Sequence, residues 1–382
     1  MSTFDVAVIG LGALGSAAAY HAAGKGAKVI AFEQFELGHV RGASHDTSRI
    51  VRTAYNTPEY VNLAKRAYKD WAELERVAGI KLLNVTGGLM FFAKDGPMPV
   101  TKYEDSLTAN NVPFESLTAQ DVKHRWPQFN VPSNVDAVYT ADTGMVHASR
   151  SVATMQLHAR ARGAAPMEHT RVQSITPQSS GNVRIETSNG LYFAGKVILA
   201  ADAWTNELLR PLGRGVPLTM MQEQVTYFKP SDPDAFKPAK FPVWIWGGDE
   251  WFYGFPTFGE PTIKAARDVS ENLMTPEERT YVPSRHLIDQ PSSFMNSMIT
   301  DPDRQELRTV TCQYVLTPDR QFVIGTVPDY QNIIVGLGAG HAFKFAPTIG
   351  RILAELAVEG TTTDDIGTFA FPKLDSAVHA RL

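Results

Sequence analysis

The segment FDVAVIGLGALGSAAAYHAAGKGAKVIAFE, residues Phe4 to Glu33, decides the fold class of this chain. A short apolar run is followed by a glycine-rich turn, a stretch of small residues, a second apolar run and an acidic residue. This order predicts a strand, a helix and a second strand, which together form the βαβ unit that binds dinucleotides. We therefore expect a mixed α/β fold that contains a Rossmann-like domain.

Three glycines in this segment, Gly10, Gly12 and Gly15, follow the order G-x-G-x-x-G. The first permits the tight turn after the strand, the second lets the backbone approach a pyrophosphate, and the third lets the helix lie close to the sheet. The pyrophosphate is expected at the free N–H groups of the helix start. Glu33, at the end of the second strand, is positioned to bind ribose hydroxyls. The alternative, a glycine-rich turn that binds nothing, does not explain this acid.

Composition limits the classes of protein that this chain can represent. Its 382 residues, 43% of them hydrophobic, exceed what one core usually holds, so we expect two domains. The net charge of −4 offers no basic surface for nucleic acid or an anionic membrane. We find no apolar run of membrane-spanning length and no secretory signal, so we expect a cytoplasmic protein. The single cysteine, Cys312, excludes an internal disulfide and cysteine-rich metal sites, and we expect no metal.

The two ends of the chain are expected to build one discontinuous domain. The segment NIIVGLGAGHAFKFAPTIGRILAELAVEG repeats the order of strand, glycine-rich turn and helix, and the run VILAA is typical of a strand buried on both faces. A helix is predicted from Pro58 to Arg76. The predicted dinucleotide-binding domain comprises residues 1–85, 145–215 and 305–375, and the predicted substrate domain comprises residues 86–144 and 216–304.

Aromatic residues gather between residues 218 and 268, where alternating patterns predict antiparallel strands. The segments FPVWIW and EWFYGFPTFG contain Trp244, Trp246 and Trp251. We expect these tryptophans to form one wall of a substrate pocket, with ordinary core packing as the alternative.

Four further segments carry a resemblance to a known family: SHDTSRIVR, YGFPTFG followed by Lys264, TCQY around Cys312, and GAGHAFKF. In this order and at these distances they resemble the monomeric sarcosine oxidase and N-methyltryptophan oxidase family, within a larger group of flavin enzymes that resemble D-amino-acid oxidase. The resemblance extends from Phe4 to about Phe371. It implies that the bound dinucleotide is FAD rather than NAD, and that the protein is a monomer.

The resemblance implies roles for Cys312 and Lys264. The first corresponds to the cysteine whose sulfur is linked to the 8α-methyl group of the flavin, and a small buried hydrophobic residue is the alternative. The second corresponds to a lysine over flavin N5 that activates O2. A cation about 4 Å away stabilises superoxide by roughly 4 kcal/mol at an effective dielectric of about 20. A lysine at the protein surface is the alternative interpretation.

The resemblance also implies residues that bind the substrate and the flavin ring. Arg52 and Lys344 correspond to a clamp for the substrate carboxylate, because a guanidinium fork and a point charge suit such a group. Arg49 and His45 correspond to residues close to the flavin. The other implied substrate residues are Tyr253, Tyr314 and Gly340. The other implied cofactor residues are Ser44, Val172, Gly338 and His341, with Lys344 also near the cofactor.

Asp268 departs from the family pattern, because the sarcosine-oxidising members have a histidine there. A carboxylate beside the substrate would repel a second carboxylate and favour an amine or several hydroxyls. The distantly related fructosyl-amino-acid oxidases also have an acid at this position. Two other departures, Asp202 and Ala342, say little about the substrate.

We therefore predict a flavin-dependent oxidase of secondary amines on amino acids, which converts an N-alkyl amino acid, O2 and water into an amino acid, a carbonyl compound and hydrogen peroxide. Lys264, Arg49, His45, Tyr253 and Asp268 are expected to take part in catalysis. An oxidase of fructosyl amino acids is the first alternative. An NAD-linked dehydrogenase is a further alternative, and so is a non-catalytic flavoprotein or a subunit of a heteromeric demethylase.

Overall fold

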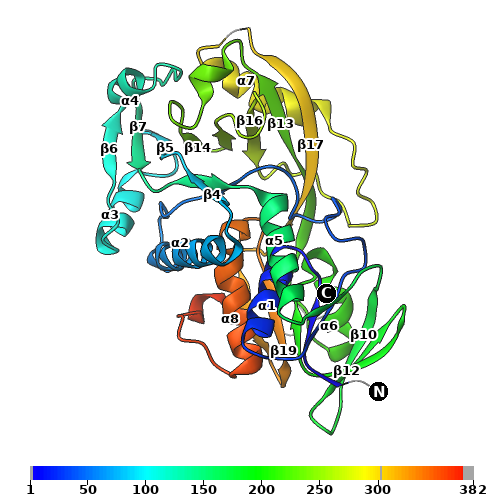
Figure 1. The fold of residues 1–382 in the computed structure, drawn as a ribbon. Helices are drawn as coiled ribbons and strands as arrows, with labels where there is room; N and C mark the ends of the chain where they lie inside the picture. Colours follow the sequence, from blue (N-terminus) through cyan, green and yellow to red (C-terminus); the bar gives the residue numbers. More distant parts are fainter. Residues whose placement is uncertain (1–2, 302, 373–382) are drawn as a thin grey trace.

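The computed structural model describes residues 3–301 and 303–372, which form two large sheets (Figure 1). The first sheet confirms the mixed α/β fold that the sequence predicts. Its central strand β1 (Thr3–Ile9) pairs in parallel with β2 (Val29–Phe32) and with β12 (Gly190–Leu199). The other five strands of this sheet are β9 (Ala165–Met167), β10 (Val172–Pro177), β11 (Val183–Thr187), β18 (Val323–Val327) and β19 (Tyr330–Leu337).

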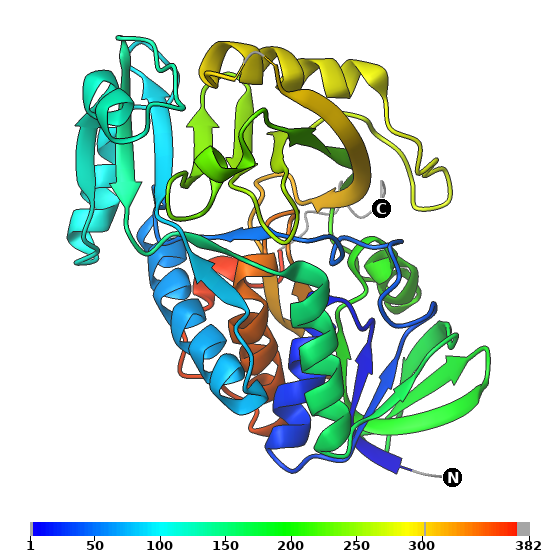
Figure 2. The same ribbon diagram turned by 45° about the horizontal axis from the view of Figure 1, so that its top comes forward.

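Four helices pack together in one layer beside this sheet (Figure 2): α1 (Ala13–Gly24), α2 (Pro58–Ala78), α5 (Ala148–Ala161) and α8 (Ala346–Val358). The central helix α1 consists mostly of small residues and is buried almost all round. It touches α8 so closely that a Cβ on Gly350 would lie 2.3 Å from the Cβ of Ala17. The position of α1, which starts at the glycine-rich turn, therefore depends on the small size of its neighbours.

Helix α2 shows how the local sequence determines an element. Pro58 occupies the first turn, where a backbone N–H would have no acceptor within the helix, so the missing N–H of proline costs nothing. Gly79 ends the helix with a φ of 66°. Its apolar residues recur every three or four positions and are buried against α8 and its neighbours. The helix predicted from Pro58 to Arg76 is confirmed within two residues of its end.

The second sheet has the strand order β17-β13-β16-β15-β14-β5-β7-β6 and is antiparallel except where β14 pairs with β5. The strands are β5 (Gly88–Ala93), β6 (Glu115–Thr118), β7 (Val135–Thr140), β13 (Thr219–Lys229), β14 (Val243–Gly247), β15 (Trp251–Phe255), β16 (Ile263–Asp268) and β17 (Gln305–Leu316). Helix α7 (Arg285–Met298) packs on it through Phe294 and Met295. The helices α3 (Thr101–Ala109) and α4 (Ala119–Arg125) lie beside β6 and β7 in sequence, and α6 (Thr205–Leu209) follows β12. A small third sheet of β3 (Arg49–Val51), β8 (Gly144–Val146) and β4 (Leu83–Val85) completes the strands.

Two features differ from the sequence prediction. Strand β17 pairs with β13 along its length, so residues 305–316 belong to the second sheet, whereas the predicted division assigned residues 305–375 to the dinucleotide-binding domain. Trp244 and Trp246 pack on the side of β14 that faces Phe294, in the core beneath α7, so they do not form the expected pocket wall. Alternation predicts two faces of a strand but does not say which of them borders a cavity.

Within the described ranges, no helix combines the length and the apolar character that a membrane crossing requires. Among the same residues, no cluster of three or more histidine, cysteine or acidic side chains is arranged to hold a metal ion.

Candidate active site

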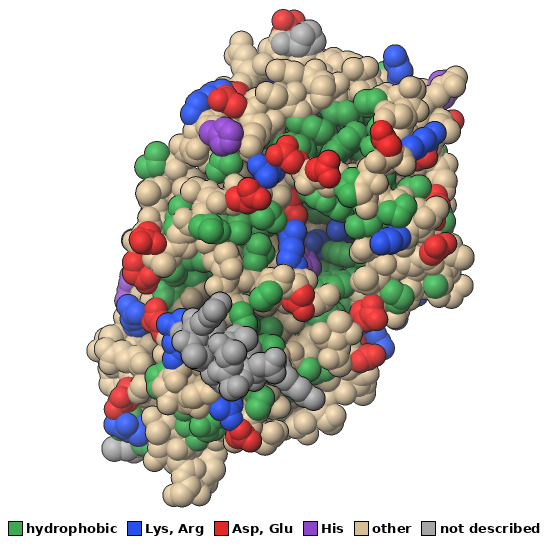
Figure 3. Space-filling model, turned by 180° about the vertical axis from the view of Figure 1, so that it is seen from behind, with side chains coloured by type: hydrophobic (Ala, Val, Ile, Leu, Met, Phe, Trp, Pro, Cys, Tyr) green, Lys and Arg blue, Asp and Glu red, His purple; other side chains and the backbone are tan. Residues whose placement is uncertain are grey.

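One cavity of about 460 Å³ draws its lining from both large sheets. A hollow with basic side chains at its centre is visible on the face drawn in Figure 3. Of the residues predicted to be catalytic or to bind the substrate or cofactor, Gly15 and Lys264 do not line the cavity. Those that do are Gly10, Gly12, Glu33, Ser44, His45, Arg49, Arg52, Val172, Tyr253, Asp268, Cys312, Tyr314, Gly338, Gly340, His341 and Lys344.

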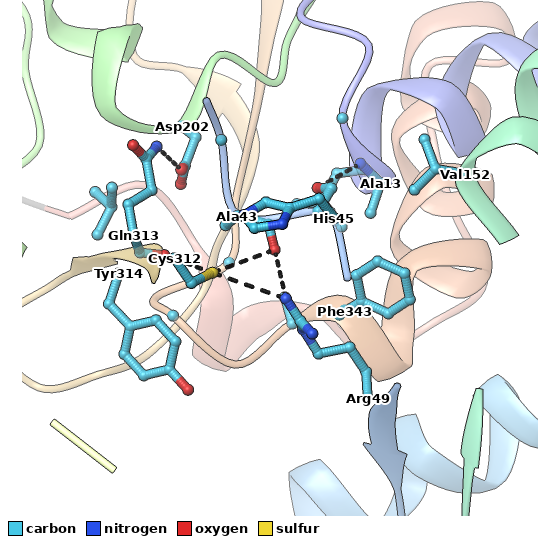
Figure 4. Close-up of a pocket in the computed structure, with 18 of the residues that line it drawn as sticks. Ala13, Ala43, His45, Arg49, Val152, Asp202, Cys312, Gln313, Tyr314 and Phe343 are labelled. Carbon is cyan, nitrogen blue, oxygen red and sulfur yellow. Dashed lines mark hydrogen bonds between the residues drawn. The ribbon is translucent and has the colours of Figure 1, made fainter. Parts of the chain in front are cut away.

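The glycine-rich turn lies at one end of this cavity, directly before α1. Gly10 has a φ of 90°, and a Cβ on it would lie 2.5 Å from the carbonyl oxygen of Ala200. A Cβ on Gly15 would lie 1.8 Å from the carbonyl oxygen of Gly10, so this glycine serves the packing of α1. At the helix start, the N–H of Ala13 donates to Ser44 Oγ at 2.9 Å (Figure 4). The remaining N–H groups of the first helical turn suit an anion such as a pyrophosphate.

Glu33 follows β2 and is held in place by backbone N–H groups. Its carboxylate accepts hydrogen bonds from Leu11 N at 2.9 Å and from Phe35 N at 3.1 Å, and His39 Nε2 lies 3.4 Å away. Although burial opposes ionisation, His39 and the bond from Leu11 lower the pKa of Glu33. An ionised, oriented carboxylate at this position suits the hydroxyls of a ribose.

Cys312 lies on β17, buried in the cavity wall (Figure 4). Its Sγ is 3.7 Å from an Arg49 guanidinium nitrogen and 3.8 Å from the carbonyl oxygen of Ala43. Burial raises the pKa of the thiol, and Arg49 and Arg279 oppose this effect. The Arg49 guanidinium is thus placed to stabilise a thiolate at this position.

Arg49 and His45 lie beside this thiol. The guanidinium of Arg49 donates to the carbonyl oxygens of Ser48, at 2.9 Å, and Ala43, at 3.2 Å. Burial, followed by the charge of Arg49, lowers the pKa of His45 to about 4, so the imidazole is neutral at neutral pH. Its Nε2 is buried without a hydrogen-bond partner among the described residues. Such an atom fits a bound polar group, and the site as a whole fits a dinucleotide that carries a ring near Cys312.

Lys264 lies on β16, behind the lining of the cavity. Its Nζ donates to Asp46 Oδ2 and to the carbonyl oxygen of Ser48, both at 3.0 Å, and its side chain is 3% exposed. Asp46 lines the cavity and also accepts a hydrogen bond from the hydroxyl of Tyr227. Burial lowers the pKa of Lys264 to about 8, although Asp46 opposes this. At Asp46 the effects of Lys264 and Arg49 outweigh burial and lower the pKa of the carboxyl.

Two cations, Arg52 and Lys344, line another part of the cavity. The guanidinium carbon of Arg52 lies 4.0 Å from the ring centroid of Tyr55, and Lys344 Nζ donates to the carbonyl oxygen of His341 at 2.9 Å. Burial, followed by the charge of Arg52, lowers the pKa of Lys344 to about 7. An anion bound between these groups would relieve their repulsion and favour the charged lysine.

His341 and Gly340 belong to the turn that precedes Lys344. Burial, followed by Lys344, lowers the pKa of His341 to about 3, and its neutral ring donates from Nε2 to the carbonyl oxygen of Arg320 at 2.9 Å. Gly340 has a φ of 78°, and a Cβ there would lie 2.9 Å from the ring of Tyr314. This histidine therefore holds the loop of Arg320 against the turn.

Asp268 lines the cavity but is already paired. Arg320 donates to both of its oxygens, at 3.0 and 3.4 Å. The half-buried tyrosines Tyr253 and Tyr314 also line the cavity, and desolvation raises the pKa of both hydroxyls. They therefore remain protonated donors across the physiological range.

Sequence reasoning missed Asp46, Glu223 and Arg320 as residues of the cavity. It also missed the structural role of Asp202, which accepts a hydrogen bond from Gln313 at 2.8 Å. Asp46 lies inside the segment SHDTSRIVR, so its position beside the predicted residues could have indicated that it belongs to the cavity. Glu223 stands in the run MQEQVTYFK, where three consecutive polar residues interrupt a strand that is buried on both faces. Such an interruption is a sign of a cavity or of a buried polar contact.

The family model described as FAD dependent oxidoreductase matches residues 5–356. The monomeric sarcosine oxidase of Streptomyces avermitilis is 35% identical over 98% of this chain and 99% of that protein. The peroxisomal sarcosine oxidase of Homo sapiens is 32% identical over 99% of this chain and 98% of that protein. Among solved structures, the open form of NikD, described as an unusual amino acid oxidase essential for nikkomycin biosynthesis, superposes with a TM-score of 0.85. It is 28% identical and the match covers 97% of this chain and 98% of that one.

Proposed function

Because this chain belongs to the family of FAD-dependent oxidoreductases, we propose that it is an oxidase of N-substituted amino acids that uses O2. One observation carries the proposal: a single cavity joins the dinucleotide turn, the lone thiol of Cys312 and the two half-buried cations Arg52 and Lys344. Sarcosine oxidases among the relatives support a small N-alkyl amino acid as substrate.

The cations are proposed to bind and orient the substrate through its carboxylate. Arg52 offers a planar fork, and Lys344 gains its full charge when the carboxylate enters. This orientation turns the substrate nitrogen and its N-alkyl group towards the flavin, and the buried walls exclude water. The protonated hydroxyls of Tyr253 and Tyr314 can donate to the substrate but cannot accept its proton as phenolates near neutral pH.

When bound, FAD would supply the two-electron oxidation of the bond between the substrate nitrogen and its neighbouring carbon, with O2 as the final acceptor and hydrogen peroxide as one product. Water would hydrolyse the imine product to an amine and a carbonyl compound. The substrate nitrogen must be neutral for this step. We expect the rate of substrate oxidation to rise with pH as the bound ammonium loses its proton, and a flat profile between about pH 6 and 10 would contradict this.

We propose that the flavin is linked covalently to Cys312. The support is the position of the thiol in the cavity and the Arg49 guanidinium nitrogen 3.7 Å away, which can stabilise the thiolate that such a bond requires. Mass spectrometry of the denatured protein measures the linkage directly, because a covalent flavin remains with the polypeptide.

We propose that Lys264 activates O2 through its positive charge. The support is a buried ammonium group paired with Asp46, whose carboxylate lines the cavity. Lys264→Met should leave anaerobic reduction by substrate nearly intact and slow reoxidation by O2 by about a thousandfold. Equal reoxidation rates in the variant and the parent enzyme would disprove the assignment.

The test of the function is a peroxide-coupled screen of sarcosine, larger N-methyl amino acids, cyclic secondary amino acids and fructosyl amino acids. Anaerobic mixing with each compound shows independently whether the flavin is reduced. If no N-substituted amino acid bleaches the flavin, the proposed function is wrong. The predicted monomer and cytoplasmic location are part of the proposal, and the name of the monomeric relatives supports the first.

An oxidase of fructosyl amino acids remains the second candidate. The acidic position that suggested it, Asp268, is paired with Arg320, so its charge alone is weak support. The NAD-linked alternative does not agree with the FAD-dependent family.

A further inference from the structure

Glu223 is an acid of the cavity that none of the roles above uses. It lies on β13, is 4% exposed, and stands directly opposite Cys312 on β17, so both side chains point to the same face of the sheet. Its Oε1 accepts a hydrogen bond from Ser270 N at 2.8 Å. In the described part of the chain, no hydrogen bond to Oε2 is formed and no lysine, arginine or histidine makes an ion pair with this carboxyl.

The neighbouring acid is in the opposite situation. Both oxygens of Asp268 receive hydrogen bonds from Arg320, which compensates its charge. The two terminal nitrogens of the Arg320 guanidinium are therefore engaged with Asp268. Glu223 is left as a carboxyl with one open acceptor atom in the cavity, which Tyr253 and Tyr314 also line.

A buried carboxyl without a counter-ion is costly for the protein alone. Burial, with a contribution from Asp268, raises the pKa of Glu223 to about 7 against the opposing effects of the Ser270 bond and Arg320. A donor brought in by a ligand would stabilise the charged form of this carboxyl.

We propose that Glu223 determines substrate specificity by accepting a hydrogen bond from an ammonium or hydroxyl group of the substrate, on a part away from the carboxylate held by Arg52 and Lys344. This inference rests on the proposed function, because it assumes that an N-substituted amino acid enters the cavity. Sarcosine has no donor besides its own reacting amine, so this inference predicts that sarcosine is not the preferred substrate.

The test compares two pairs of substrates that differ only in the donor groups. Nα-methyl-lysine and Nα-methyl-norleucine differ in the side-chain ammonium group, and N-fructosyl-glycine and N-hexylglycine differ in the sugar oxygens. In the parent enzyme we expect kcat/KM to favour the donor-bearing member of one pair by about tenfold to a hundredfold, and the responding pair identifies the source of the donor. Preference for the apolar member in both pairs would overturn the proposal.

Glu223→Gln keeps an oxygen for Ser270 N and presents an amide NH2 towards the donor. We expect this variant to reduce the preference within the responding pair to about threefold or less. Glu271→Gln, which changes an exposed acid one residue after Ser270, is the matched control and should keep the parent preference. An unchanged preference in Glu223→Gln would refute the role of this carboxyl.

A binding measurement separates this inference from the proposed reaction. Nα-trimethyl-lysine and Nα-trimethyl-norleucine have no nitrogen lone pair, so they can bind but cannot be oxidised to an imine. If the lysine pair responds, calorimetry should show tighter binding of the lysine derivative, and Glu223→Gln should remove the difference. Discrimination in binding without any flavin reduction by N-methyl substrates would disprove the oxidase function and keep the Glu223 site. Flavin reduction without discrimination in binding would support the oxidase function and disprove the Glu223 site.

Discussion

Replacing Asp46 with asparagine should change how fast the reduced enzyme reacts with O2, although no role in substrate binding is assigned to Asp46. Its Oδ2 lies 3.0 Å from Lys264 Nζ, and both side chains are buried. Two unit charges at this distance attract each other by about 5 kcal/mol at an effective dielectric of about 20, which corresponds to about 4 pH units in the pKa of the lysine. Asp46→Asn should therefore leave Lys264 neutral at pH 7.

The sign of the pH dependence follows from the lowered pKa of Lys264. In the parent enzyme the ammonium form is complete well below pH 8 and is lost as the pH rises through about 8. The rate constant for reoxidation should fall over the same range. In Asp46→Asn this fall should shift to a more acidic range, and at pH 7 reoxidation should be slower by about a hundredfold to a thousandfold.

The assay is stopped-flow mixing of the reduced enzyme with oxygenated buffer between pH 6 and 9. Tyr227→Phe is the matched control, because it removes the hydroxyl that donates to Asp46 and leaves both charges in place. This control should slow reoxidation by less than about tenfold, in line with one lost hydrogen bond. If Asp46→Asn folds, binds flavin and is reoxidised at the parent rate and with the parent pH profile, the reasoning is refuted.

Three further predictions concern other parts of the molecule. Cys312→Ala should yield a protein whose yellow colour stays in solution after acid precipitation, and flavin retained by the denatured variant would contradict the proposed linkage. Arg52→Ala should raise KM for a carboxylate substrate by about tenfold or more and affect the carboxamide analogue much less, since one charge-assisted bond is lost; equal effects on both compounds would argue against the clamp. Arg351→Leu removes the partner of Asp70, Glu355 and Asp364. Thermal unfolding should show that the free energy of unfolding falls by about 2 to 3 kcal/mol. An unchanged melting temperature would show that this network contributes little.

The parts of the fold that the sequence predicted well depend on local patterns. The glycine order and the acid after the second apolar run occupy one continuous segment, Phe4 to Glu33, and Pro58 and Gly79 mark the two ends of α2 within their own neighbourhood. The end of β12, residues 197–199, was readable because these consecutive apolar residues are buried on both faces of the sheet. In each case the physical cause lies within a few residues of its effect.

The parts that could not be predicted depend on pairs of residues that are far apart in sequence. Lys264 and Asp46 are separated by 218 positions, and Asp268 and Arg320 by 52, so nothing local indicates either pair. The resemblance suggested that Lys264 and Asp268 belong near the reaction, but not which groups control their charges. Trp244 and Trp246 were misplaced for a related reason, because the face of β14 that they occupy is chosen by α7.

The tight contact between α1 and α8 makes cofactor retention sensitive to a residue that no ligand touches. Any side chain at Gly350 would place its Cβ 2.3 Å from the Cβ of Ala17, so α1 and α8 would have to move apart. The glycine-rich turn is attached to the end of α1, so the displacement would reach the phosphates. Mutagenesis confined to the walls of the cavity would overlook this position, and variation at Gly350 offers a way to loosen flavin without altering any group that contacts it.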